Sequence, residues 1–247
     1  ADAAPTVAVL PAPEALAVHA DGCRCLTLDA LVAQLEEERE ALPPVPRCLE
    51  DLAAILYTSG TTGRSKGAML SQGNLLSNAQ ALRSLWGWQA DDVLVHSLPI
   101  YHVHGLFVAL HCAMLEPSEV HFLPRFSPEA VLDALPGATV FMGVPTHYVR
   151  LLDTSGLSAE ASAGMRLWVS GSAPLRPETQ GAFEARTGHQ ILERYGMSEA
   201  GMITSNPLKG ARVPGTVGFV LPEGEVRLRS EEGEPVPEGA VGVLEIR

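Results

Sequence analysis

Short apolar runs alternate with short helical segments through the middle of this chain. Expected strands lie at 93–97, 119–123, 139–144, 166–170 and 190–195, and expected helices lie at 104–115, 128–135, 146–152 and 177–187. Gly188 follows the last of these helices, where a glycine commonly ends a helix. Strands that alternate with helices form a parallel sheet covered by helices on both faces. The pattern therefore predicts an α/β fold with a mostly parallel sheet flanked by helices.

Two features extend this core toward the N-terminus. The continuous apolar run at 52–57 indicates another buried parallel strand. Ser71 is suited to cap a helix, and apolar side chains recur after it at helical spacing: Leu75, Ala79, Leu82 and Trp86.

The two ends of the chain differ from the core. Residues 1–50 contain an apolar run at 7–10, a helical stretch at 28–42 and a proline-rich linker at 43–46. From Gly215 onward helical patterns stop, and short strands are expected at 217–220, 225–229 and 241–246. We expect residues 1–50 to be a strand, helix and linker of the same large domain, 51–212 to be the core, and 213–247 to be a small β-rich subdomain.

The charge balance argues against polyanionic partners. The chain has 17 Lys and Arg residues against 29 Asp and Glu residues, a formal net charge of -12. Most of its surface would repel a nucleic acid or an anionic membrane. We expect no nucleic-acid partner, and any anionic ligand must be held by local donors.

The cysteines and the apolar stretches indicate a reducing compartment and no membrane span. Cys23, Cys25, Cys48 and Cys112 match no zinc spacing and suggest no disulfide framework. The most apolar stretch, 97–114, contains a proline and three histidines, which suit a buried strand and helix better than a bilayer. No signal peptide is visible, so we expect a cytoplasmic protein, or a mitochondrial matrix protein if the source is eukaryotic.

The segment YTSGTTGRSKG at 57–67 is the most unusual in the chain. It follows an expected buried strand, and open α/β sheets bind ligands at the ends of strands. Its glycines let the backbone approach an anion, its hydroxyls supply donors, and Lys66 is one of two lysines in the chain. It has neither the Walker A spacing nor a GxGxxG turn. These residues indicate a polyphosphate-binding loop, although a flexible Gly/Ser/Thr linker is the alternative.

This segment closely resembles the phosphate loop of the adenylate-forming superfamily, which includes acyl-CoA synthetases, luciferases and peptide-synthetase adenylation domains. The resemblance continues in order through LPIYHVHG (98–105), GVPTHY (143–148), SGSAPL (170–175), ERYGMSE (193–199) and PGTVG (214–218). It covers roughly residues 50–247. The resemblance implies the residue roles that follow.

The resemblance implies a nucleotide site on three motifs. The β- and γ-phosphates of ATP would contact Thr58, Ser59, Gly60, Thr61, Thr62, Gly63 and Lys66. Ser172, Ala173 and Pro174 would form one wall of the adenine pocket, and Tyr195 would stack on the ring. Glu193 belongs to the same nucleotide-binding set, Gly196 and Met197 would line the acyl-adenylate site, Ser198 would meet the α-phosphate, and Glu199 would ligate Mg²⁺. Ser198 stands where threonine is usual, which keeps the hydroxyl.

The motifs LPIYHVHG, VSGSAPL and ERYGMSE are especially similar to those of malonate-CoA ligases. In those enzymes the arginine of ERYG binds the distal carboxylate of a dicarboxylic acid. A guanidinium offers a bidentate fork to such a group, so Arg194 would recognise the second acid group. His102 would lie near the reacting carboxylate, His104 could assist at the distal one, and Met197 would contact the acid. The alternative is that Arg194 pairs with an acid such as Glu193 and that the histidines only pack in a polar corner.

The implied reaction has two steps: a carboxylic acid and ATP form acyl-AMP and pyrophosphate, and coenzyme A then displaces AMP. Lys66, His102, Ser198 and Glu199 would be the catalytic residues, with ATP, Mg²⁺ and coenzyme A as cofactors and co-substrates. The family's C-terminal catalytic domain is expected to be absent, so this chain alone would be poorly active. Two alternatives stay open: a non-catalytic nucleotide-binding fragment or degenerate homologue, and an adenylation domain that loads a carrier protein.

Overall fold

The computed structural model describes residues 6–10, 23–37, 43–58 and 65–247. The chain forms two compact units, Ala1–Pro46 and Arg47–Arg247. In the first unit, β1 (Val7–Leu10) pairs in parallel with β2 (Arg24–Thr27), and α1 (Leu28–Glu37) follows directly. The strand expected at 7–10 and the first part of the expected helix are confirmed. Residues 38–42 lie outside the described part of the chain.

The second unit is built on a seven-stranded sheet with the order β11-β10-β9-β8-β7-β5-β6. Its strands are β5 (Val93–His96), β6 (Glu119–Phe122), β7 (Val140–Gly143), β8 (Leu167–Ser170), β9 (Ile191–Met197), β10 (Gly201–Ser205) and β11 (Phe219–Val220). The strands β5 to β9 pair in parallel, and β10 and β11 pair antiparallel beside β9. The predicted α/β fold with a mostly parallel sheet is therefore confirmed.

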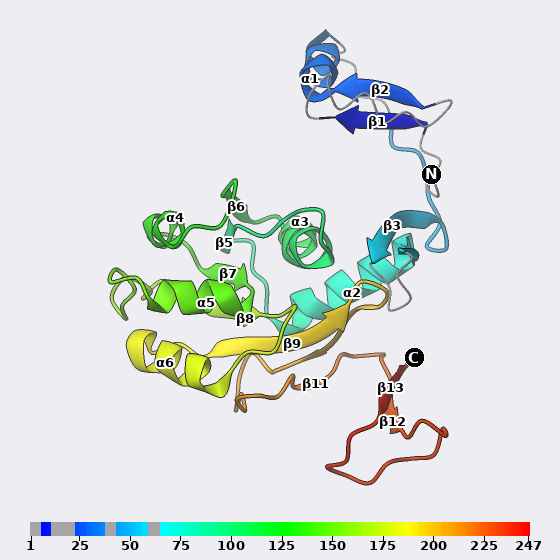
Figure 1. The fold of residues 1–247 in the computed structure, drawn as a ribbon. Coiled ribbons are helices and arrows are strands. Elements are labelled where there is room, and N and C mark those ends of the chain that lie inside the picture. The colour runs from blue at the N-terminus through cyan, green and yellow to red at the C-terminus, as the bar shows by residue number, and fades with distance from the viewer. Residues whose placement is uncertain (1–5, 11–22, 38–42, 59–64) are drawn as a thin grey trace. The chain divides into compact units, whose positions relative to one another are not determined.

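Helices cover both faces of this sheet (Figure 1). One face packs against α2 (Gln72–Leu85), η2 (His104–Leu110) and α3 (His111–Leu115). The other packs against α4 (Pro128–Ala134), α5 (Pro145–Leu152) and α6 (Pro177–Thr187). Successive strand residues point to opposite faces, so Phe141 enters the second core while Met142 enters the first. This explains why the central strands are apolar at nearly every position.

Local signals set the ends of two predicted helices. The Ser71 hydroxyl accepts a hydrogen bond from the Asn74 amide at 3.1 Å, and the Asn74 side chain accepts one from the Ser71 amide at 3.0 Å. This capping box begins α2 where the sequence predicted it. Gly188 ends α6 with a positive φ of 76°, which a glycine adopts without strain.

The run at 52–57 is not a buried strand of the parallel sheet, so that prediction was wrong. It forms β3 (Leu52–Thr58), which pairs antiparallel with β4 (Lys66–Ser71) in a separate two-stranded hairpin. Several apolar side chains of the hairpin are exposed, among them Ile55 and Tyr57. A continuous apolar run does not distinguish a strand buried on both faces from one that is half covered. The strand β4 was missed because Gly67 interrupts its apolar pattern.

Three further elements differ from the sequence expectation. The segment expected as one helix at 104–115 begins with a seven-residue π-helix, η2, before the α-helical turn of α3. The strand β10 was not predicted, and β11 joins the central sheet beside it. The remaining strands, β12 (Val226–Arg229) and β13 (Val243–Ile246), form their own antiparallel pair. The proposed domain boundary at residue 213 stays a prediction.

The structure also bears on the cysteines and on membrane crossing. Cys23, Cys25, Cys48 and Cys112 all lie in the described part of the chain and are free thiols. Within that same part, none of the helices has the length and apolar character that crossing a bilayer requires.

Candidate functional site

A cavity of about 430 Å³ opens at the carboxyl-terminal edge of the parallel strands. It is lined by the segment after β5 (Leu98–Gly105), by residues after β7 and β8, and by the end of β9. Open α/β sheets bind ligands at this edge because strand ends and loops converge there. Four sequence motifs far apart in the chain, LPIYHVHG, GVPTHY, SGSAPL and ERYGMSE, therefore meet around one cavity.

Arg194 is the charged side chain at the centre of this site. It is 3% exposed, and its Nε and Nη2 atoms are buried without a hydrogen-bond partner. Its guanidinium crosses directly over Gly171, where an added Cβ would lie 2.3 Å from Arg194 Cζ. Burial lowers the pKa of Arg194 to about 10. A buried cation without a partner is costly, so the site is built to receive an anion.

Arg194 does not pair with Glu193, so the structural alternative for this arginine was wrong. Neighbouring residues of β9 point to opposite faces of the sheet. Glu193 Oε1 accepts a hydrogen bond from the Leu175 amide at 3.0 Å, and burial raises the pKa of this carboxyl. Among the residues that the structure describes, no carboxylate forms an ion pair with Arg194.

His104 supplies a neutral imidazole beside the guanidinium. It begins the π-helix η2 and is 4% exposed, and its Nδ1 lies 3.3 Å from the Ser172 hydroxyl. Burial holds the pKa of His104 well below its usual range, and the nearby Arg194 charge lowers it further. The Nε2 atom of this ring is buried without a partner. π-Helical turns are rare and are frequently found at functional sites.

The other predicted acid-binding residues also line the cavity. His102 is exposed at its mouth, where its ring centroid lies 4.8 Å from that of Tyr101. Gly196, Met197 and Ser198 border it from the end of β9. The structure thus brings the predicted acid-binding set together: His102, His104, Arg194 and Met197.

Of the predicted phosphate-binding residues, the structure describes Thr58 and Lys66, which lie on the β3–β4 hairpin. Thr58 pairs in register with Lys66 where the hairpin closes, and the Lys66 side chain is exposed. The Thr58 hydroxyl donates a hydrogen bond to Glu199 Oε1 at 3.2 Å, although 141 residues separate the two in sequence. The start of the YTSGTTGRSKG motif therefore contacts the end of the ERYGMSE motif. The predicted contacts Ser59, Gly60, Thr61, Thr62 and Gly63 lie outside the described residues.

The predicted adenine-binding residues border the same edge of the sheet. Ala173 and Pro174 are exposed in the loop after β8, and Tyr195 is half-buried on β9. Tyr195 and Glu193 alternate with Arg194, so they lie on the opposite face of the strand. Ser172 differs from its neighbours because its hydroxyl lies 3.3 Å from His104 Nδ1 and because the residue lines the cavity of about 430 Å³. It adopts a positive φ of 69°, which is uncommon for a serine.

Two residues of the site were missed in the sequence. His147 lies in the first turn of α5 and lines the cavity, and Gly171 makes room for Arg194. His147 stands within the GVPTHY motif, in the first turn of the helix expected at 146–152, which follows the strand expected at 139–144. That position was a usable signal, because residues that follow parallel strands share one edge of the sheet.

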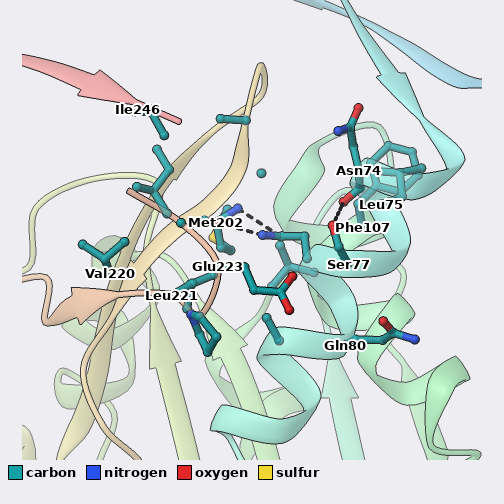
Figure 2. A pocket seen from close by; sticks show the side chains of 18 of the residues that line it. Asn74, Leu75, Ser77, Gln80, Phe107, Met202, Val220, Leu221, Glu223 and Ile246 are labelled. Carbon is teal, nitrogen blue, oxygen red and sulfur yellow. Dashed lines mark hydrogen bonds between the residues drawn. The ribbon is translucent and has the colours of Figure 1, made fainter. Parts of the chain in front are cut away.

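A larger cavity, of about 770 Å³, lies between α2, η2, β10 and the 220–225 segment. Figure 2 shows Ser77, Phe107, Met202 and Glu223 around it. Among its described lining residues are three carboxylates, Glu199, Glu223 and Glu225, and a single basic side chain at position 247. This lining suits an anionic acid less well than the cavity around Arg194.

The comparisons with known proteins agree on one family. A family model described as AMP-binding enzyme matches residues 2–247. The malonate–CoA ligase ACSF3, mitochondrial, of Mus musculus is 44% identical over 195 residues, which are 72% of this chain and 33% of that protein. A malonate–CoA ligase of Arabidopsis thaliana is 40% identical over 206 residues, 75% of this chain and 34% of that protein.

Solved structures give the same result. The crystal structure of ATP-bound MatB from Rhodopseudomonas palustris is 47% identical with a TM-score of 0.95, and the match covers 100% of this chain and 51% of that one. A malonyl-CoA ligase in a ternary product complex with methylmalonyl-CoA and AMP is 36% identical with a TM-score of 0.85, over 100% of this chain and 53% of that one. This chain thus spans 33% to 34% of these curated relatives and 51% to 53% of these solved chains.

Proposed function

Because the chain belongs to the family of AMP-binding enzymes, we propose that it forms the nucleotide- and acid-binding core of an acid–thiol ligase for malonate or a related short dicarboxylate. The resemblance to the adenylate-forming superfamily is confirmed by the family match, and relatives at 40% to 44% identity are malonate–CoA ligases. The reaction is the ATP-dependent formation of acyl-AMP and pyrophosphate, followed by transfer of the acyl group to coenzyme A.

The observation that carries the proposal is the guanidinium of Arg194, which lines a cavity of about 430 Å³ and has no partner among the described residues. Two of its nitrogens are buried without partners, and a carboxylate can satisfy both in a bidentate pair. Among the described residues, the cavity offers no carboxylate that would compete for this charge. A monocarboxylic acid held by its reacting group would leave the guanidinium unpaired. A short dicarboxylate places its second carboxylate there.

The two histidines contact opposite ends of the acid. His104 is neutral and buried, so it contributes a hydrogen bond to the distal carboxylate without adding a second charge. His102, at the exposed mouth of the cavity, lies beside the reacting carboxylate. Holding the acid at both ends fixes the attacking oxygen toward the α-phosphorus, and such positioning supplies much of the rate in reactions between two substrates.

The nucleotide is held from the hairpin side. Thr58, Ser59, Gly60, Thr61, Thr62, Gly63 and Lys66 bind the β- and γ-phosphates, Ser198 meets the α-phosphate, and Ser172 to Pro174 with Tyr195 and Glu193 border the adenine. Lys66 neutralises charge on the pyrophosphate that leaves. The contact between Thr58 and Glu199 supports this arrangement because it joins the hairpin to the ERYGMSE motif.

Glu199 fits a role as a magnesium ligand. In the described part of the chain, no three His, Cys, Asp or Glu side chains are grouped to hold a metal by themselves. Magnesium is commonly held by one or two carboxylates together with substrate phosphates, and Glu199 lies where the hairpin and the end of β9 meet. When bound, the ion neutralises developing charge on the phosphates. Glu199 would hold the ion, and the Thr58 hydroxyl would orient the Glu199 carboxylate through its hydrogen bond.

The acceptor is assigned to coenzyme A rather than to a carrier protein. Curated relatives at 40% to 44% identity are named malonate–CoA ligases, and one solved relative is described as a complex with methylmalonyl-CoA and AMP bound.

Isothermal titration of this chain tests the proposal. Malonate and acetate are titrated separately into the chain with ATP and Mg²⁺ present, and Arg194→Lys is compared with the wild type. Malonate should bind more tightly than acetate, and the lysine variant should lose malonate affinity far more than acetate affinity because an ammonium lacks the bidentate fork. Equal losses for the two acids would refute the dicarboxylate assignment.

A further inference from the structure

His147 stands at the wall of the acid cavity without an assigned role. It lies in the first turn of α5, directly after the carboxyl end of β7, and lines the same 430 Å³ cavity as Arg194, His104 and Ser172. It is close enough to His104 to lower the pKa of that imidazole, as Arg194 also does. Four polar side chains, from α5, β9, η2 and the loop after β8, therefore surround one space.

The His147 ring is held in a fixed plane. It stacks on Phe126 with ring centroids 3.7 Å apart and an interplanar angle of 2°. The Arg150 guanidinium, one helical turn further along α5, lies 5.0 Å from the centroid of the same Phe126 ring. An imidazole stacked in this way cannot rotate freely. A pre-positioned donor loses little conformational entropy when a ligand binds.

The two ring nitrogens of His147 differ in their exposure. Its Nδ1 atom is buried without a hydrogen-bond partner, and a Cβ built on Gly143 would lie 3.2 Å from it. The Nε2 atom has no hydrogen-bond partner among the described residues, and it is not one of the fully buried atoms. Nε2 is therefore the nitrogen left to meet an incoming group.

The charge of the cavity matches one carboxylate. Burial, reinforced by the charge of Arg150, lowers the pKa of His147 to about 4, so the ring is neutral near pH 7. Arg194 supplies one positive charge, and the neutral His104 and His147 supply hydrogen bonds. One carboxylate has two oxygens with about four lone-pair sites, more than a single guanidinium satisfies.

We infer that His147 is a specificity-determining residue whose Nε2–H donates a hydrogen bond to the distal carboxylate held by Arg194. The inference rests on the proposed function, because it assigns a further contact to the same dicarboxylic acid. The acid is then gripped by Arg194 from β9, by His104 from η2 and by His147 from α5. A monocarboxylic acid makes none of these distal contacts, so His147 raises the preference for dicarboxylates.

A matched pair of substitutions tests the assignment. His147→Phe keeps an aromatic ring to stack on Phe126 but has no donor. His147→Gln loses the stack but places an amide N–H near the position of Nε2. Binding of malonate, acetate and ATP to the 247-residue chain is measured by isothermal titration, and thermal melting without ligand verifies that each variant is folded.

His147→Phe should weaken malonate binding about tenfold to a hundredfold, the range expected for one lost hydrogen bond to a charged group. Acetate and ATP binding should stay within about twofold of the wild type, and His147→Gln should recover most of the malonate affinity. Unchanged malonate binding by His147→Phe would overturn the inference while leaving the proposed function intact. A wild-type chain that binds ATP but no malonate would overturn both.

A second measurement covers the case in which His147→Phe does not fold. The side-chain ¹⁵N resonances of His147 in the wild-type chain should move when malonate is added and stay in place when acetate is added. If the His147 side-chain resonances do not shift under conditions in which malonate binds, the inference is overturned.

Discussion

Replacing Arg194 by methionine should make the unliganded protein more stable while removing its affinity for malonate. The arginine is 3% exposed and two of its nitrogens have no partner. Burial lowers its pKa to about 10, whereas a free guanidinium has a pKa above about 12. A cation whose pKa is lower in the folded state destabilises the fold at every pH below that lowered pKa. Each pKa unit corresponds to about 1.4 kcal/mol of free energy. The lowered pKa of Arg194 therefore reduces the free energy of unfolding near pH 7 by an amount on the order of 3 kcal/mol.

Methionine has a similar length and no charge, so Arg194→Met relieves this cost. We expect the midpoint of urea unfolding at pH 7 to rise by about 1 M, given typical denaturant slopes. With malonate at about one hundred times its dissociation constant, the wild type should gain about 2.7 kcal/mol of stability and the variant should gain none. The urea unfolding curves of the wild type and Arg194→Met should therefore approach each other when malonate is added.

Arg166→Met is the matched control. Arg166 Nε donates a hydrogen bond to Asp92 Oδ1 at 2.6 Å, and the Asp92 side chain is 2% exposed. The same substitution there leaves a buried carboxylate without its cation, which typically costs about 3–5 kcal/mol. If Arg194→Met is destabilised as Arg166→Met is, then Arg194 has partners in solution and the reasoning about an unsatisfied guanidinium fails.

Three other outcomes follow from local geometry. Gly171→Ala places a Cβ 2.3 Å from Arg194 Cζ, so titration should show malonate affinity reduced about tenfold or more while the fold is kept; normal affinity would show that the guanidinium sits elsewhere. Burial would raise the pKa of Asp92, but hydrogen bonds from Arg166, Thr139 and the Gln89 amide lower it overall. The stability that this carboxylate contributes is complete above about pH 4 and is lost as the pH falls through the lowered pKa, so urea midpoints measured from pH 5 to pH 2 should fall more steeply for the wild type than for Asp92→Asn. Ser71→Ala removes the capping box of α2 and should cost about 1 kcal/mol in urea unfolding, whereas an unchanged midpoint would mean that packing alone sets this helix end.

The sequence predicted elements best where local and tertiary signals agree. The helix α6 runs over Pro177–Thr187 and ends at Gly188 as expected, because proline, periodicity and glycine all point to the same bounds. The hairpin of β3 and β4 was mistaken for a sheet strand because an apolar run says nothing about which partner covers it. Strand β10 was missed because it is a short segment, Gly201–Ser205, whose pairing with β9 is a tertiary contact.

The same limit applies to the site. The resemblance placed Arg194 and His104 in one acid-binding set, and the structure brings both to one cavity. No pattern in the chain could show that Arg194 lacks a partner, since that depends on which carboxylates fold near it. The position of His147 on α5 depends likewise on its stacking with Phe126, which lies 21 residues earlier, in the loop before α4.

Strand β9 presents Arg194 to one side of the sheet and Glu193 to the other, and this has a consequence for how such proteins can change over time. Point substitutions in 191–197 alter one face and leave the other untouched. Inserting or deleting a single residue there would exchange the two sets of side chains at once. Lineages that diversify their acid preference should therefore vary the identity of residues along this strand but preserve its length, and length variation should be confined to the turns on either side.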